Sequence, residues 1–141
     1  MRRLISVLAV FFLLALSAIG VAESEIPDLK GAWVIKASGH MVLKPEAPHL
    51  PDVGPGFHEL EIPLVIEGQD GFRFFGYKQV TKKFRKEISG VIGFDNKTIY
   101  MTEENAITMG TLVSPDRMEC VFLESGKSLS IASREIITRK K

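Results

Sequence analysis

The stretch Gly31-Ala32-Trp33-Val34-Ile35-Lys36-Ala37 begins the first expected strand and holds the only tryptophan of the chain. Trp33, Ile35 and Ala37 are apolar, whereas Lys36 and Ser38 fall on the other parity, and a period of two with one polar face is typical of a half-buried antiparallel strand. A large ring at this point can close one end of a barrel, with its indole N–H bonded to a backbone carbonyl. Trp33 is therefore expected to be either such a plug or an ordinary core residue.

The residues before this stretch have the pattern of an export signal. Two arginines precede the apolar run 4–16, and Gly20-Val21-Ala22 is a small-x-small cleavage site. Together they predict a secretory signal peptide over residues 1–22, cleaved after Ala22. The apolar run is too short for a stable membrane span, and an uncleaved anchor is the alternative. The expected location is the periplasm or the external medium.

Residues 23–141 are expected to form a single domain. Its 119 residues can bury a sizeable core without covalent staples. Without the two leader arginines, 16 basic residues face 17 acidic ones, and this near-neutral balance argues against a nucleic-acid partner. Cys120 is the only cysteine and cannot form an internal disulfide. Its alternation with Met118 and Phe122 indicates a small buried hydrophobic residue rather than a reactive thiol.

Turn signals divide the domain into short segments of alternating polarity. Strands are expected over 31–44, 58–67, 72–80, 88–94, 98–102, 106–113, 118–123 and 129–139. Gly68-Gln69-Asp70-Gly71 has the chemistry of a hairpin turn, and Pro63 is expected to mark an edge or a bulge because it lacks an N–H donor. The loop from Pro45 to Gly56 contains four prolines, and it is either a lid or a tolerated insertion.

Eight strands joined by tight turns predict an all-β domain. Sequential hairpins favour an antiparallel up-and-down barrel over a sandwich, and closure removes the unpaired edges that a secreted β-protein must otherwise protect. An eight-stranded barrel is just wide enough to be filled by side chains or to hold one small ligand.

Gly31-Ala32-Trp33 and the eight-strand meander resemble the calycin group, which includes the lipocalins and the avidin-like proteins. The resemblance covers the whole expected domain, but its residue match is a Gly-x-Trp motif alone. In lipocalins an arginine of the last strand stacks on this tryptophan, and Arg134 or Arg139 could do so here. The chain departs from the group in having no disulfide pair and no recognisable barrel-mouth polar set of the biotin binders. The resemblance therefore implies a fold and a cavity but no particular ligand.

No catalytic or metal-binding motif is present. The chain lacks a Gly-x-Ser-x-Gly elbow, a phosphate loop and a His-Glu-x-x-His pair. His40, His49 and His58 are too widely spaced to predict a metal site. We therefore predict no metal, no cofactor and no catalytic residue, and an enzymatic activity is not favoured.

The sequence favours an exported barrel that binds a small, mostly apolar ligand in its cavity. The second hypothesis is a protein-binding module, such as an inhibitor of a secreted hydrolase, acting through loops and outer aromatic residues. The third is a barrel isomerase or cyclase, which would need polar side chains converging inside the cavity. A protein partner and a homo-oligomer both stay open. The expected ligand-contacting residues are Trp33, Ile35, His58, Leu60, Ile62, Phe74, Tyr77, Tyr100, Met109 and Phe122.

Overall fold

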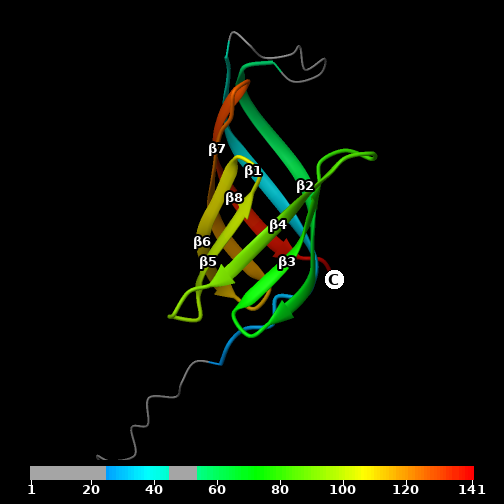
Figure 1. Cartoon of the computed structure of the whole chain (residues 1–141), viewed down its shortest axis with the longest axis vertical. Helices are drawn as coiled ribbons and strands as arrows, with labels where there is room; N and C mark the ends of the chain where they lie inside the picture. The colour runs from blue at the N-terminus through cyan, green and yellow to red at the C-terminus, as the bar shows by residue number, and fades with distance from the viewer. Residues whose placement is uncertain (1–24, 45–53) are drawn as a thin grey trace, which may run out of the picture.

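The computed structural model describes residues 25–44 and 54–141 (Figure 1). The expected signal peptide and most of the proline-rich loop, with His49, lie outside the described residues. None of the described residues belongs to a helix that is long and apolar enough to cross a membrane. The strands are β1 (Gly31–Leu43), β2 (Gly56–Asp70), β3 (Arg73–Gln79), β4 (Arg85–Ile92), β5 (Thr98–Glu103), β6 (Ala106–Ser114), β7 (Arg117–Ser125) and β8 (Leu129–Arg139).

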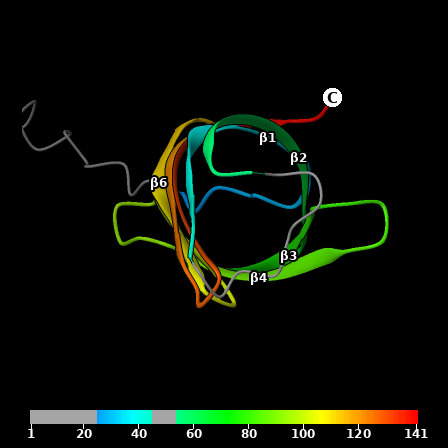
Figure 2. The same cartoon turned by 90° about the horizontal axis from the view of Figure 1, so that it is seen from above.

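The eight strands form a closed barrel in which every strand pairs with its neighbours in the chain. β1 pairs with both β2 and β8, and all pairings are antiparallel. Figure 2 shows the closed ring seen from above. The predicted all-β up-and-down barrel is thus confirmed, and the sandwich alternative does not apply.

The first hairpin after the long loop differs from the prediction. β2 continues to Asp70, which pairs with Arg73, so the turn is Gly71-Phe72 rather than Gly68 to Gly71. Gly71 has a φ of 57°, which glycine adopts without steric cost, and this makes it the natural turn residue. A bulge between Ile66 and Gly68 shifts the register before the turn.

β1, β2, β7 and β8 extend beyond the other strands at one end of the barrel, here called the open end (Figure 1). The β2–β3 ladder begins at Leu64–Lys78, whereas the β1–β2 ladder continues from Leu64 to Gly56. The first part of β2 therefore has a partner on one side only. Pro63 lies just past the last β2–β3 pair, which places it at the local edge that its missing N–H favours.

Trp33 and the segment before β1 close the opposite end of the barrel, here called the base. Trp33 is 1% exposed, and its indole N–H donates to the carbonyl of Leu29 at 2.9 Å. Gln69 accepts a hydrogen bond from the Leu29 amide and donates one to Pro27, which fixes this segment below the barrel. Figure 2 shows the segment (blue) crossing the end of the ring. The plug interpretation of Trp33 is confirmed.

Arg139, not Arg134, stacks on the tryptophan. Its guanidinium lies 4.3 Å from the Trp33 ring, and its N–H groups donate to the carbonyls of Lys30 and Asp28 at 2.7 and 2.8 Å. Arg134 has the opposite parity in β8 and lies on the outside of the barrel. Strand parity relative to the buried Glu135 and Ile137 decides between the two arginines.

Apolar side chains fill the interior from the base upward. These buried residues are Leu29, Trp33, Ile35, Leu64, Ile66, Phe74, Ile88, Ile92, Ile99, Met101, Met118, Cys120 and Ile137. They come from all strands except β6, whose Leu112 packs against them. The packed base supports a different set of inward side chains nearer the open end.

Candidate functional site: a polar cluster inside the barrel

Above the apolar base, four buried polar side chains point into the barrel, and we call Lys78, Glu103, Thr108 and Glu135 the interior polar cluster. The Lys78 ammonium donates to Glu103 Oε1 at 2.9 Å and to Thr108 Oγ1 at 3.4 Å. It also lies 4.5 Å from the centre of the Phe122 ring. Side chains of β5, β6 and β7 therefore surround this cation, which comes from β3.

The cluster contains carboxylate oxygens that are not satisfied within the described chain. Glu103 Oε2 and Glu135 Oε2 are both buried and have no hydrogen-bond partner among the described residues. Such a group carries a desolvation cost of about 1–3 kcal/mol, more when it is charged. Two unpartnered acceptors at one place indicate a demand for donors that the described residues do not meet.

The carboxyl of Glu135 is the least compensated group of the cluster. It is 3% exposed, and burial raises its pKa above the usual 4.5. The Lys78 charge opposes this increase, and the negative charge of Glu103 adds to it. Glu135 is thereby held toward its protonated form and can donate as well as accept a proton.

A second ion pair lies beside the cluster. Lys86 of β4 and Glu124 of β7 share the inward parity of their strands and approach to 3.5 Å. Both side chains are more exposed than Lys78 and Glu103. The polar side chains of the interior thus become more exposed toward the open end.

A row of inward positions connects Glu135 to solvent. Ala37 of β1 pairs with Glu135 on one side and with Leu60 of β2 on the other. Leu60 has the inward parity of the buried Leu64, yet it is 47% exposed because β3 does not reach its level. Only the methyl group of Ala37 therefore separates Glu135 from Leu60 along this row.

Most of the sequence-predicted contact residues do share the interior. Trp33, Ile35 and Phe74 are buried in the packed base, where their contacts are with other core side chains. Ile62 packs against this core, and Phe122 contacts Lys78. His58 and Leu60 have inward positions at the open end.

Tyr77, Tyr100 and Met109 lie outside the barrel, so the prediction that they face the cavity is wrong. Tyr100 and Met109 are 45% and 42% exposed and pair with each other across β5 and β6. Lys78 and Thr108 take the inward positions beside Tyr77 and Met109. The sequence interpretation assigned these apolar and aromatic residues inward, whereas polar residues occupy the interior there.

None of the four residues of the interior polar cluster is among the site residues predicted from the sequence. Strand parity does point to them. Lys78 lies on the same face of its strand as Phe74, and Glu103 lies on the same face as Ile99 and Met101. Charged residues are almost never fully buried without a partner, so polarity alone argued for the outside. Only the closure of the barrel shows that they face one another.

Cys120 has the predicted buried position next to this cluster. Burial raises the pKa of its thiol to about 12, with a further contribution from Glu135. A thiol with so high a pKa is neither a nucleophile nor a metal ligand at neutral pH. Of the two histidines in the described residues, His40 packs on Phe57, and His58 bonds to the carbonyl of Gly54. Residues 25–44 and 54–141 contain no group of three metal-ligating side chains.

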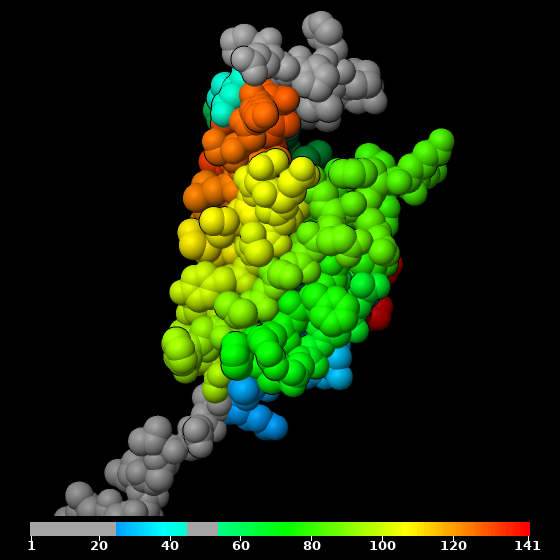
Figure 3. Space-filling view, viewed as in Figure 1, coloured from blue at the N-terminus to red at the C-terminus, as the bar shows by residue number. Residues whose placement is uncertain are grey.

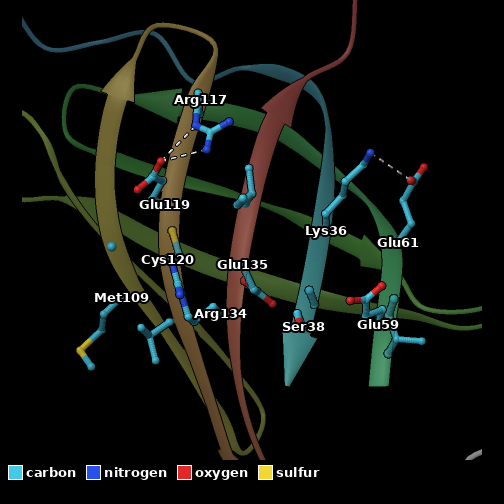
Figure 4. A pocket seen from close by; sticks show the side chains of 15 residues that line it. Lys36, Ser38, Glu59, Glu61, Met109, Arg117, Glu119, Cys120, Arg134 and Glu135 are labelled. Carbon is cyan, nitrogen blue, oxygen red and sulfur yellow. Dashed lines mark hydrogen bonds and ion pairs between the residues drawn. The ribbon is translucent and has the colours of Figure 1, made fainter. Parts of the chain in front are cut away.

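A groove of about 790 Å³ lies on the outer side of the barrel (Figure 4). Its lining comes from β2, β1, β8, β7 and β6. It includes the outward Ser38 and Arg134, which lie side by side, and also Ala37, Leu60 and Glu135. Figure 4 shows the exposed pairs Lys36–Glu61 and Arg117–Glu119 at its margins. Next to it, half-exposed apolar side chains form what we call the outer apolar patch, which consists of Val91, Tyr100, Ile107, Met109, Val121 and Leu123. The strand wall β4–β6 that carries part of this patch is continuous in the space-filling view (Figure 3).

Comparisons with known proteins give no relative for this chain. No protein-family model matches it, and neither a curated protein nor a solved structure matches it at a significant level.

Proposed function

We propose that the protein is an exported barrel that binds one small amphipathic molecule at the open end of its interior. The observation that carries this proposal is the pair of buried carboxylate oxygens, on Glu103 and Glu135, that have no partner in the described chain. A ligand with hydrogen-bond donors would satisfy them, which is the usual way in which few polar groups orient a ligand in an apolar site.

The surroundings favour a ligand with an apolar body. Leu60, Ile62 and Ala37 face inward around the route to Glu135, and Phe122 lies on the far side beside Lys78. The site therefore differs from the cavity expected from sequence, since Lys78, Glu103 and Glu135 replace the tyrosines as polar partners. A calycin-like relationship is supported by the closed meander and by Arg139 on Trp33, and export is supported by the pattern of residues 1–22.

The first test is native mass spectrometry of the protein recovered from the exported fraction of cells that express the full chain. We expect a bound small molecule on the wild-type protein. Ala37→Leu would fill the route to Glu135 and should abolish the bound mass. Ser38→Leu, one residue along, would fill the outer groove and should retain it. A small molecule that is lost from Ser38→Leu but kept by Ala37→Leu would contradict an interior site.

A second candidate function is protein binding through the outer apolar patch. Its six large apolar side chains are 41–51% exposed and occupy neighbouring positions on β4, β5, β6 and β7. Contiguous exposed apolar surface marks interaction sites. Among the outer aromatic residues of β3, Phe75 is also exposed, whereas Tyr77 is covered in part by Arg85.

The variants separate the two candidates. If the patch is the functional surface, Met109→Glu should abolish a co-purifying protein partner in native mass spectra, and Ala37→Leu should leave that complex intact. A partner that survives Met109→Glu would exclude the patch as its docking site.

A further inference from the structure

The inward side chains of the described residues include three glutamates and two lysines, so one carboxyl group among them has no cationic partner. This difference indicates which kind of hydrogen-bond donor the site accepts. Lys78 is neutralised by Glu103 at 2.9 Å, and Lys86 by Glu124 at 3.5 Å. Glu135 has no ion pair within the described chain, although it is 3% exposed. Lys78 and Glu103 act on Glu135 electrostatically, and Cys120 pairs with it. The other inward titratable groups are Lys86 of β4, Glu124 of β7, and His58 at the mouth on β2.

A buried carboxylate without a partner is costly, and a cation is the partner that offsets most of this cost. The two lysines are already paired, and the Cys120 thiol is uncharged at neutral pH because its pKa is raised to about 12. His58 bonds to the carbonyl of Gly54 at the mouth, so none of these inward groups forms an ion pair with Glu135 within the described chain. The missing positive charge would therefore come from the ligand.

The side chain that lies between Glu135 and the mouth of the barrel is small, which favours a ligand with a compact cationic head. Ala37 separates Glu135 from the half-exposed Leu60, so a ligand that enters along Leu60 reaches the carboxyl over a single methyl group. An ammonium has three donors on a small tetrahedral head, whereas a guanidinium is a wide planar fork. Charge-assisted hydrogen bonds to a carboxylate are about twice as strong as neutral ones.

Building on the proposed function, we infer that the ligand carries a protonated amine that forms an ion pair with the Glu135 carboxylate. Its apolar body lies against Ala37, Leu60 and Ile62. The unpartnered Glu103 Oε2 adds a second acceptor close to Lys78. Glu135 is thus the residue that determines specificity for a cationic ligand over a neutral one.

The inference predicts a proton exchange upon binding. Burial raises the pKa of Glu135, so the free protein holds a proton on this carboxyl in acidic solution. An ammonium favours the ionised carboxylate, and that proton leaves to the buffer when the amine binds. A neutral alcohol of the same shape would release none.

Two probes of equal shape test the inference: cyclohexylmethylamine, which is protonated at neutral pH, and cyclohexylmethanol. Isothermal titration calorimetry with the exported protein should show the amine binding at least about tenfold more tightly than the alcohol. Glu135→Gln should remove this preference and leave the alcohol affinity within about twofold. Glu61→Gln, a matched change on the outer face, should leave both affinities unchanged.

The outcomes separate this inference from the proposed function. If both probes bind equally and Ala37→Leu abolishes both, the interior site stands and the amine preference is wrong. If neither probe binds to the wild-type protein, both proposals are overturned. If Glu135→Gln loses the near-ultraviolet circular dichroism of the folded barrel, the amine preference is tested on the wild-type protein alone, by its proton release upon binding. Calorimetry of the wild-type protein in two buffers of different ionisation enthalpy, repeated from pH 4.5 upward, should then show proton release with the amine and none with the alcohol in the range between 4.5 and the raised pKa of Glu135, and zero release with both at every pH overturns the inference.

Discussion

At the residue scale, Arg139 shows how one side chain can connect three separate segments. Besides stacking on Trp33 and bonding to Asp28 and Lys30, its Nε donates to Asp116 in the turn between β6 and β7 at 3.0 Å. A planar guanidinium can satisfy these partners together, because its N–H groups point in fixed directions within one plane.

We predict that Arg139→Lys lowers the free energy of unfolding by about 1–2 kcal/mol, because an ammonium cannot reach all these acceptors and cover the indole at once. Urea denaturation monitored by Trp33 fluorescence measures the change. Arg134→Lys on the outer face is the control, with an expected effect below about 0.5 kcal/mol. Equal effects of the two substitutions would refute the anchoring role of Arg139.

At the scale of the strand, glycines on the inner wall make room for large neighbours. Gly90 of β4 pairs with Phe74 of β3, and the Phe74 ring covers it so closely that a Cβ on Gly90 would lie 2.2 Å from the ring. The Phe74 ring thus occupies the space that a side chain at position 90 would fill. A glycine in a strand is unfavourable by itself, but the ring packed on it compensates.

Gly90→Ala should therefore destabilise the barrel by about 1–3 kcal/mol, since Phe74 has to leave its position in a packed core. Thermal unfolding followed by circular dichroism would show the loss. Gly126→Ala is the matched control, because the nearest atom to its added Cβ is 3.8 Å away. A Gly90→Ala protein as stable as Gly126→Ala would mean that the ring is not fixed by the glycine.

At the scale of the whole molecule, the buried ion pair couples β3 to β5 across the interior. The side chains of Lys78 and Glu103 are 5% and 4% exposed, so neither charge can be solvated if the other is removed. The exposed pair Lys36–Glu61 at 4.0 Å has no such constraint. Burial, rather than distance alone, decides how much each pair matters.

Glu103→Leu and Lys78→Met should each cost about 3–5 kcal/mol, because each leaves one buried charge without its partner. The double variant should recover most of that loss, since it leaves an apolar pair of similar volume. A double-mutant cycle by urea denaturation measures the coupling. Lys36→Met should change stability by less than about 0.5 kcal/mol, and additive losses in the cycle would contradict the coupling.

Glu135 should make the stability of the entire barrel depend on pH. Its pKa is raised in the folded state, so the unfolded chain loses this proton first as the pH rises above the usual 4.5. The contribution is fully present below that value and is lost as the pH rises through the raised pKa. Relative to Glu135→Gln, the wild-type protein should therefore lose stability as the pH rises from about 4.5 toward neutral. Unfolding free energies of both proteins across this range test the prediction, and parallel profiles would contradict it.

The sequence by itself determined the strands and their meander. The alternation around Trp33 and from Leu60 to Ile66 is local, and it predicts which face of a strand is buried without knowledge of its neighbours. The buried Cys120 and the plug formed by Trp33 were predictable for the same reason. The prediction of export rests on the sequence pattern of residues 1–22 alone.

Only the tertiary structure decided which inward residues meet. Lys78, Glu103 and Glu135 lie 25 and 32 residues apart along the chain, and a charged residue in a strand looks exposed until closure brings an opposite charge across the interior. In the closed barrel Arg139, and not Arg134, has the inward parity that brings it to Trp33. Tyr100 and Met109 lie on the outer face. The physical reason is that alternation fixes two faces for each strand, whereas the ends, the bulge and the register of the barrel fix which faces share one interior.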